Sequence, residues 1–154
     1  MGKNIGGDIM KHAEKAAELF SKNFNCAQSV FASFSEDLGI SEEIALKTGA
    51  CFGSGMKKGE VCGACTGALM ALGIKYGHSD GNDNESKQKS GEMAVLFLEE
   101  FKKANGSYIC RELLGCDIGT KEGLESAMSK NLFTEFCPKM VISAAEIAEN
   151  IMSK

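Results

Sequence analysis

The chain has 154 residues, of which 44% are hydrophobic and 25% charged, and its formal net charge is −4. Residues 1–154 fit a single domain with one core, and this composition excludes a disordered or fibrous chain. Because the lysines are scattered among acidic residues and form no basic stripe, the charge pattern argues against a nucleic-acid partner.

The N-terminal segment and the hydrophobic stretches indicate where the protein works. Residues 1–7 show no apolar run after Lys3, and Gly6 stands where a myristoylation signal has Ser or Thr. The most apolar stretch, residues 61–74, is too short to cross a bilayer. We therefore expect a cytoplasmic protein without membrane insertion. Thiols stay reduced in that compartment, so the seven cysteines of the chain favour metal or thiol chemistry over structural disulfides.

Apolar side chains recur at helical spacing through the first third of the chain and predict three helices. The first spans residues 8–22 and is amphipathic. The second follows Asn25, a good N-cap residue, and ends at Gly39, which suits a helix C-terminus. The third begins after Ser41 with acids in its first turn and leads into a glycine-rich loop, residues 53–59.

The rest of the chain predicts a central helix, a long helix and a last helix. Residues 62–76 are almost uniformly small or apolar, which is typical of a helix surrounded by others. A polar segment leads to the long helix, which ends at Asn105, and short helical turns are expected near residues 110–115 and 120–130. Pro138 suits the first position of the last helix. The pattern predicts an all-α fold, a single-domain helical bundle of about five main helices plus short helical turns.

Four of the seven cysteines fall at or just before a predicted helix start, namely Cys26, Cys62, Cys110 and Cys137. Unpaired N–H groups and the positive end of the helix dipole lower the pKa of a thiol there and favour an anionic metal–sulfur centre. Four thiolates are the number that holds zinc or a common iron–sulfur cluster. We take these four as the candidate cofactor and metal ligands, which only the fold could bring together.

Cys62 and Cys65 form a C-x-x-C at a helix start, the local arrangement by which dithiol oxidoreductases acidify the attacking sulfur. Both are therefore candidate catalytic residues. The helical pattern on either side denies the βαβ context of a thioredoxin fold. For Cys51 and Cys116 we prefer the interpretation of a small buried apolar residue, and for Cys65 both interpretations stay open.

Other signals point less directly to chemistry. The two histidines, His12 and His78, cannot build a His-rich metal centre and are interpreted as surface residues. The loop at residues 53–59 lacks the ending and the preceding strand of a phosphate loop. Its glycines either form an anion-binding nest near the start of the Cys62 helix or make an ordinary turn.

The cysteines belong to longer motifs that follow one another in the order Asn25-Cys26-Ala27-Gln28, Phe52-Gly53-x-Gly55-Met56, Gly59-x-x-Cys62-Gly63-Ala64-x-x-Gly67-Ala68, Cys110-Arg111-x-Leu113-x-Gly115 and Cys137-Pro138. Over most of the chain these motifs resemble the redox-active protein family named for its C_GCAxxG_C_C pattern. The resemblance implies a small helical domain, a redox role and four signature cysteines, matched here by Cys26, Cys62, Cys110 and Cys137. A similar domain accompanies haem in the split-Soret cytochromes, where an iron–sulfur centre is associated with it. No C-x-x-C-H motif for haem attachment occurs here, so haem is not implied.

Three functions remain as expectations. The first is electron transfer through an iron–sulfur cluster bound by the four signature cysteines. The second is a metal-free thiol–disulfide protein in which Cys62 attacks and Cys65 or another cysteine resolves the mixed disulfide. The third is a zinc-stabilised interaction module. The sequence does not identify the redox partner and leaves a homodimer open.

Overall fold

The computed structural model describes residues 11–154, and in these residues the chain forms helices, turns and one isolated pair of bridged residues. This confirms the predicted all-α class. The predicted start of the first helix at residue 8 and the interpretation of residues 1–7 lie outside the described residues. The helices are α2 (Lys11–Ser21), α3 (Cys26–Ser33), α4 (Ser35–Leu38), α5 (Glu42–Gly49), the π-helical turn η1 (Gly55–Gly59), α6 (Gly63–Tyr76), α7 (Asn84–Asn105), α8 (Cys110–Leu114), α9 (Lys121–Ser129), α10 (Leu132–Glu135) and α11 (Cys137–Met152).

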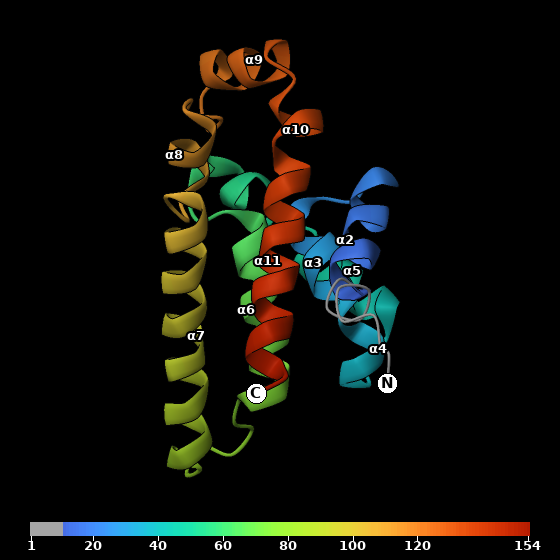
Figure 1. Cartoon of the computed structure of the whole chain (residues 1–154), viewed down its shortest axis with the longest axis vertical. Helices are drawn as coiled ribbons and strands as arrows, with labels where there is room; N and C mark the ends of the chain where they lie inside the picture. Colours follow the sequence, from blue (N-terminus) through green and yellow to red (C-terminus); the bar gives the residue numbers. More distant parts are fainter. Residues whose placement is uncertain (1–10) are drawn as a thin grey trace, which may run out of the picture.

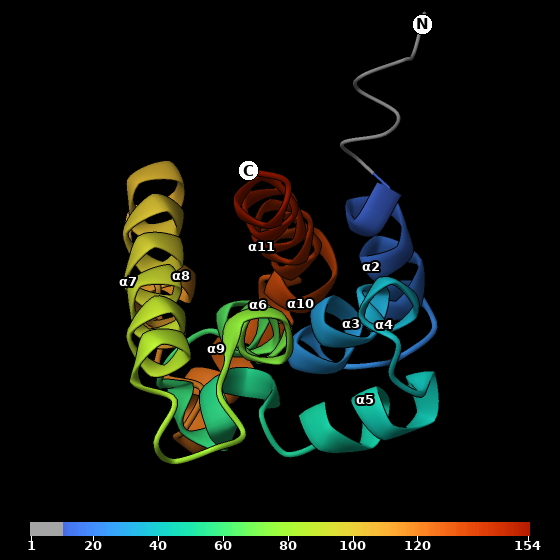
Figure 2. The ribbon, with the colours of Figure 1, turned by 90° about the horizontal axis from the view of Figure 1, so that it is seen from below.

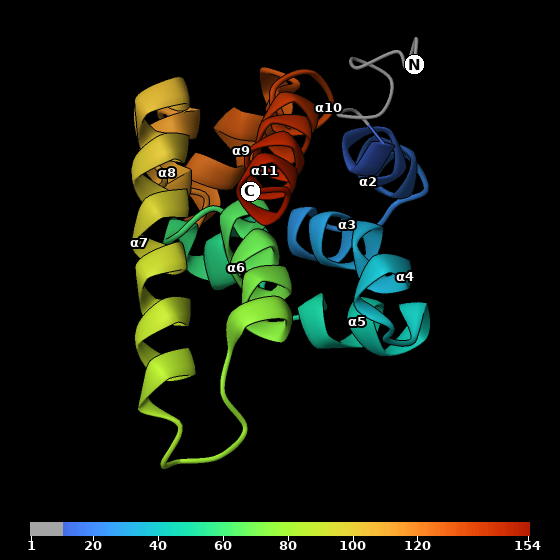
Figure 3. The ribbon, with the colours of Figure 1, turned by 60° about the horizontal axis from the view of Figure 1, so that its bottom comes forward.

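The longer helices pack in layers. Helices α7, α11 and α2 lie side by side in Figure 1, with α11 in the middle. Seen from below in Figure 2, α6 and α3 form the next layer, and α5 covers the outer side of α3. Helix α6 thus contacts α3, α7 and α11, as Figure 3 also shows. Among residues 11–154, no helix combines the length and hydrophobicity needed to cross a membrane.

Small residues let α6 approach α3 closely. A Cβ atom added at Gly67 would lie 2.5 Å from the carbonyl oxygen of Ala27. Ala64, Ala68 and neighbouring apolar residues of α6 are buried on several sides. The uniform small-residue composition of this helix therefore reflects its position between other helices, as predicted.

The second predicted helix is broken at Phe34 into α3 and α4, which is a correction to the sequence analysis. The Phe34 N–H donates to the carbonyl oxygen of Phe31, three residues back, at 3.1 Å. The hydroxyl groups of Ser33 and Ser35 donate to carbonyl oxygens of the preceding turn at 2.7 and 2.8 Å. Such bonds compete with the helical pattern and bend the chain. The break places the Phe34 ring in the core, where it is almost fully buried.

His12 is buried, so its interpretation as a surface residue was wrong. Its Nε2 atom lies 2.7 Å from Oδ2 of Asp37 in α4, and its Nδ1 atom contacts Oε1 of Glu149 in α11. The imidazole ring stacks on Phe34 with 4.2 Å between ring centroids. The ring can be buried because carboxylates from two other helices meet its two nitrogens.

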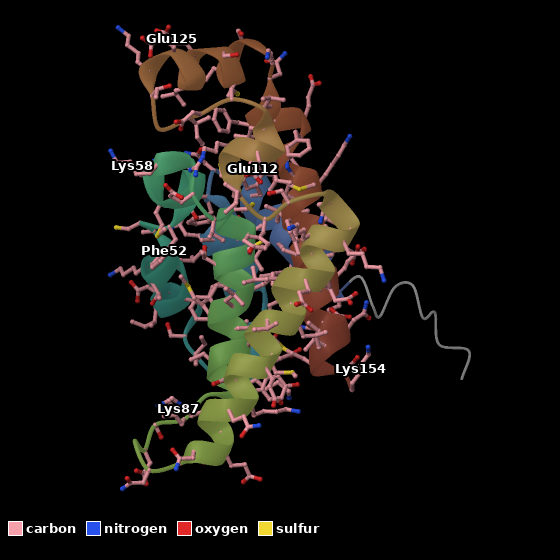
Figure 4. The ribbon with its side chains drawn as sticks, turned by 90° about the vertical axis from the view of Figure 1, so that its left-hand side faces the viewer. Phe52, Lys58, Lys87, Glu112, Glu125 and Lys154 are labelled. Carbon is pink, nitrogen blue, oxygen red and sulfur yellow. The ribbon has the colours of Figure 1, made fainter. Side chains whose placement is uncertain are left out.

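A second, smaller core lies at the end of the molecule where α8, α9 and α10 meet the start of α11 (Figure 1). Its buried members are Cys110, Leu114, Ile118 and Ala127. In Figure 4, Glu112 marks α8 and Glu125 marks α9 at this end. Helices α8 and α9 agree with the predicted turns, whereas α10 was not predicted. The N-cap of α10 is Asn131 in the left-handed region, with φ of 57°, a conformation that asparagine tolerates better than most residues.

Candidate functional site

The four signature cysteines line one cavity of about 230 Å³ between the two cores. Cys26 begins α3, Cys62 is the N-cap of α6, Cys110 begins α8 and Cys137 begins α11. In the part of the chain that the structure describes, no charged side chain lines this cavity, whose other walls are Phe20, Asn23, Phe24, Asn25, Ser54, Gly55, Gly63, Leu113, Leu114, Ile118, Phe133, Phe136 and Met140. Four segments that are distant in the sequence therefore bring a thiol to one apolar space.

A capping box fixes the start of α3 and hence Cys26. The side-chain oxygen of Asn25 accepts from the N–H of Gln28 at 2.8 Å, and the Gln28 side chain accepts from the N–H of Asn25 at 2.9 Å. The Gln28 amide group also donates to the carbonyl oxygen of Leu46 in α5 at 2.9 Å. The residues on either side of Cys26 thus anchor it to both its own helix and α5.

A short antiparallel bridge between Val61 and Ile109 positions Cys62 and Cys110 together. The N–H of Cys62 donates to the carbonyl oxygen of Tyr108 at 2.8 Å, and the N–H of Cys110 donates to that of Glu60 at 2.5 Å. The Arg111 guanidinium stabilises the same junction: it donates a hydrogen bond to the carbonyl oxygen of Gly59 at 3.1 Å and forms an ion pair with the Glu60 carboxylate at 3.2 Å. Arg111 therefore binds an acidic neighbour and the backbone.

The glycine-rich loop approaches the cysteines through a left-handed turn. Ser54, Gly55, Met56 and Lys57 have φ values of 57°, 59°, 58° and 65°. A Cβ atom at Gly55 would lie 3.0 Å from Cβ of Cys110, and one at Gly63 would lie 3.2 Å from Cβ of Cys26. Figure 4 locates this segment between the labelled Phe52 and Lys58. The absence of side chains at these glycines keeps space beside the thiols.

Cys26 and Cys137 form a hydrogen-bonded pair across the α3–α11 contact. The hydrogen bond to Cys137, together with burial, raises the pKa of Cys26 well above its ordinary value. The same bond lowers the pKa of Cys137, so Cys26 donates and Cys137 is the sulfur that carries negative charge more readily. Sequence reasoning missed this pair, because nothing in the sequence says that the first turn of α3 meets the first turn of α11.

Cys62 and Cys65 form a second pair within the first turn of α6. A hydrogen bond from the Cys65 thiol, aided by the N–H groups of Ala64 and Cys65, lowers the pKa of Cys62 despite burial. Burial and the neighbouring Cys62 sulfur raise the pKa of Cys65. Cys65 is fully buried and does not line the cavity. Cys62 therefore lines the cavity, whereas Cys65 lies in the core next to it and hydrogen-bonds to the Cys62 sulfur.

Two of the remaining three cysteines, Cys51 and Cys110, differ from the sequence-based expectations. Burial raises the pKa of Cys110 to about 12, although it begins a helix, so a helix start alone does not ionise a thiol. Cys51 is exposed beyond the end of α5, which overturns its interpretation as a buried residue. Cys116 is half-buried beside the smaller core, and its thiol donates to the carbonyl oxygen of Leu114 at 3.7 Å. Neither Cys51 nor Cys116 lines the cavity.

The cavity offers four cysteine sulfurs beside the neutral polar side chains of Asn23, Asn25 and Ser54, and cysteine thiolates are the ligands that iron–sulfur clusters use. In the described part of the chain, no three His, Cys, Asp or Glu residues are grouped so as to hold one metal ion. The four thiols surround the cavity and do not converge on a point. Four cysteines are the number of ligands that a common iron–sulfur cluster takes.

The fold and the site together define a class of small helical protein in which four cysteine thiols line one cavity. The chain belongs to the C_GCAxxG_C_C family, whose description reads "putative redox-active protein", and the family model matches residues 24–151. That stretch contains every cysteine of the chain. Searches among curated proteins and among solved structures gave no match.

Proposed function

We propose that the protein transfers electrons through an iron–sulfur cluster bound by Cys26, Cys62, Cys110 and Cys137. The observation that carries the proposal is the placement of these four thiols around one uncharged cavity. When bound, such a cluster supplies one-electron chemistry that no side chain of this chain provides. The resemblance to the domain of the split-Soret cytochromes supports the same choice. A reducing cytoplasm would keep the thiols free for ligation.

The chain's own residues would tune such a centre. The amides of Ala64 and Cys65 donate toward the Cys62 sulfur and so stabilise negative charge on it. Phenylalanine side chains, including Phe20 and Phe136, give the cavity a largely apolar wall beside the sulfurs. Hydrogen bonds to sulfur and solvent exclusion are two of the factors by which proteins set the potential of a sulfur-ligated centre.

Anaerobic purification followed by iron, sulfide and zinc analysis tests the proposal. We expect iron and acid-labile sulfide in comparable amounts, with visible absorption that is bleached by dithionite. Replacement of any of the four cavity cysteines by serine should reduce both contents. Stoichiometric zinc without sulfide would instead support the zinc-stabilised module and contradict the cluster.

A metal-free thiol–disulfide activity is the second candidate, and the hydrogen-bonded Cys62–Cys65 pair favours it. The Cys62 thiolate would attack one sulfur of a disulfide substrate and release the other as a thiolate. Cys65 would then lose its proton and attack the Cys62 sulfur, which releases the second substrate thiol and leaves a Cys62–Cys65 disulfide. Two electrons pass from the pair to the substrate. Iron-free protein should then reduce a disulfide, and the Cys65→Ala variant should stop at the mixed disulfide.

A further inference from the structure

An apolar groove of about 480 Å³ adjoins the cysteine cavity, and its lining residues come from the end of α2, the turn after it, α10 and the start of α11. The groove and the cavity share four lining residues, which are Phe20, Asn23, Phe24 and Phe133. The groove is completed by Ala17, Ser21, Thr134 and Pro138. A molecule in the groove would therefore be separated from the thiol-lined space only by these shared side chains.

The turn between α2 and α3 presents the aromatic rings to the groove. Asn23 has φ of 77°, and its N–H donates to the carbonyl oxygen of Phe20 at 3.1 Å. The N–H of Phe24 donates to the carbonyl oxygen of Leu19 at 3.4 Å and closes the same turn. Phe20 and Phe24 therefore face the groove from either side of Asn23, and Phe133 faces it from α10. Three phenylalanine rings around one space favour a planar aromatic ligand.

The lining also restricts the charge of the ligand. Among residues 11–154, no Asp, Glu, Lys, Arg or His lines either the groove or the cavity, although 25% of the chain is charged. Nucleotide cofactors carry phosphates, which proteins bind with cationic side chains or amide clusters, and no cationic side chain lines this groove. The polar side chains at the groove are Ser21, Asn23 and Thr134. The hydroxyls of Ser21 and Thr134 donate to backbone carbonyl oxygens at 2.6 and 3.2 Å, so the Asn23 amide is the donor that suits a ring oxygen. Quinones and hydroquinones combine these properties with redox activity.

We propose that this groove binds an uncharged, planar aromatic molecule of the quinone class beside the cysteines. The physiological role of the groove rests on the proposed redox function: a bound quinone would become a hydroquinone by taking two electrons, passed from the reduced cysteine site, and two protons from water. Binding itself needs no electron transfer. It can therefore be measured with a ring compound that is neither reduced nor attacked by thiols.

The test compares 2-naphthol with naphthalene-2-sulfonate, which share one ring system but differ in charge. Binding to the full chain is measured by equilibrium dialysis and ligand-observed NMR, and the lack of tryptophan leaves naphthol fluorescence free for a third readout. We expect saturable binding of 2-naphthol, and binding of the sulfonate that is weaker by about tenfold or more. Phe133→Ala should weaken 2-naphthol binding about three- to tenfold.

Thr134→Glu supplies a variant that keeps the fold, because Thr134 is exposed on α10. The new carboxylate at the groove wall should weaken 2-naphthol binding about tenfold. Thr48→Glu is the matched control, since Thr48 is also an exposed helical threonine whose hydroxyl donates to a backbone carbonyl, and it lies on α5, away from the groove. It should bind 2-naphthol like the parent.

Three results would overturn the proposal. They are equal binding of the two naphthalenes, unchanged binding in both groove variants, and a parent dimer that Thr134→Glu converts to monomers, which would make the groove a subunit interface. Iron and sulfide are measured on the same samples. Naphthol binding without iron would contradict the cluster alone, and iron without naphthol binding would contradict the groove alone.

Discussion

The Cys62 sulfur is subject to opposing effects. Burial favours its neutral form, whereas the Cys65 thiol and two backbone N–H groups stabilise the thiolate, and the net result is a lowered pKa. Cys110 is also buried at a helix start, but no hydrogen bond contributes to its pKa, which burial raises to about 12. The pKa directions of Cys62 and Cys110 therefore differ with the hydrogen bonds that each sulfur accepts, although both residues lie at helix starts.

Cys62→Ser should abolish iron and sulfide binding, or the thiol reactivity of the cavity, and leave the helical fold intact. Serine is close to cysteine in size and can still cap α6, but its hydroxyl stays protonated at neutral pH and is a poor iron ligand. Cys51→Ser is the control, because Cys51 is exposed and does not line the cavity. Anaerobic spectra, alkylation rates and circular dichroism of both variants check the contrast. If Cys62→Ser kept the metal content and alkylation pattern of the parent, Cys62 would not be the centre of the site.

Cys65→Ala should raise the pKa of Cys62 in metal-free protein, since the largest contribution to its lowering is the hydrogen bond from Cys65. A higher pKa means less thiolate at neutral pH, so the Cys62 alkylation rate should fall at pH 7 and its midpoint should move to higher pH. The rate is followed from pH 6 to pH 10 with iodoacetamide and peptide mass spectrometry. An unchanged midpoint would show that the amides of α6 lower the pKa without Cys65.

At the scale of the elements, the close contact between α6 and α3 depends on a glycine, Gly67, which has no side chain. Gly67→Ala should destabilise the protein by about 1–3 kcal/mol, the usual range for overpacking. The added Cβ would lie 2.5 Å from the Ala27 carbonyl oxygen and 3.1 Å from its Cα, and backbone atoms cannot move aside easily.

Gly73→Ala is a control on the same helix, because a Cβ atom there has nothing within 4 Å. It should stabilise the protein by about 0.5–1 kcal/mol, since alanine favours a helix more than glycine does. Urea unfolding followed by circular dichroism measures both variants. The same sign for the two changes would contradict the close contact between α6 and α3.

At the scale of the whole molecule, His12, Asp37 and Glu149 form a cluster that links α2, α4 and α11. Burial would raise the pKa of Asp37, but its hydrogen bond and charge interaction with His12, and those with Lys11, lower it below the ordinary value of 3.8. A lowered pKa adds stability that is present above the unfolded-state value and is lost as the pH falls through the folded-state value. The free energy of unfolding should therefore fall as the pH drops below about 4.

Asp37→Asn should flatten this pH dependence, because the side chain no longer titrates. Glu36→Gln, on the same short helix and exposed, should keep the slope of the parent. Urea unfolding from pH 5 down to pH 3 gives the slopes. An Asp37→Asn slope equal to that of the parent would show that the acid sensitivity arises elsewhere in the molecule.

Local signals in the sequence predicted most helices, because caps such as Asn25 and Thr120 and apolar periodicity act within a few residues. The break at Phe34 and the burial of His12 could not be predicted in this way, since both depend on contacts with other helices. Motif order singled out the four cysteines that line the cavity. Their pairing and the opposite pKa shifts within each pair follow from packing, which spacing along the chain does not encode.

The four cysteines that line the cavity are synthesised one after another, and the cavity is complete only when the last of them is in place. Cys137 begins α11, the last described helix, and α11 packs against α2, α3 and α6. A ribosome releases this helix after the segments that carry Cys26, Cys62 and Cys110. A nascent chain that stops short of α11 has three of the four thiols and lacks one wall of the cavity. The full set of four thiols, and the cavity that they line, therefore exists only once α11 has packed against the earlier helices.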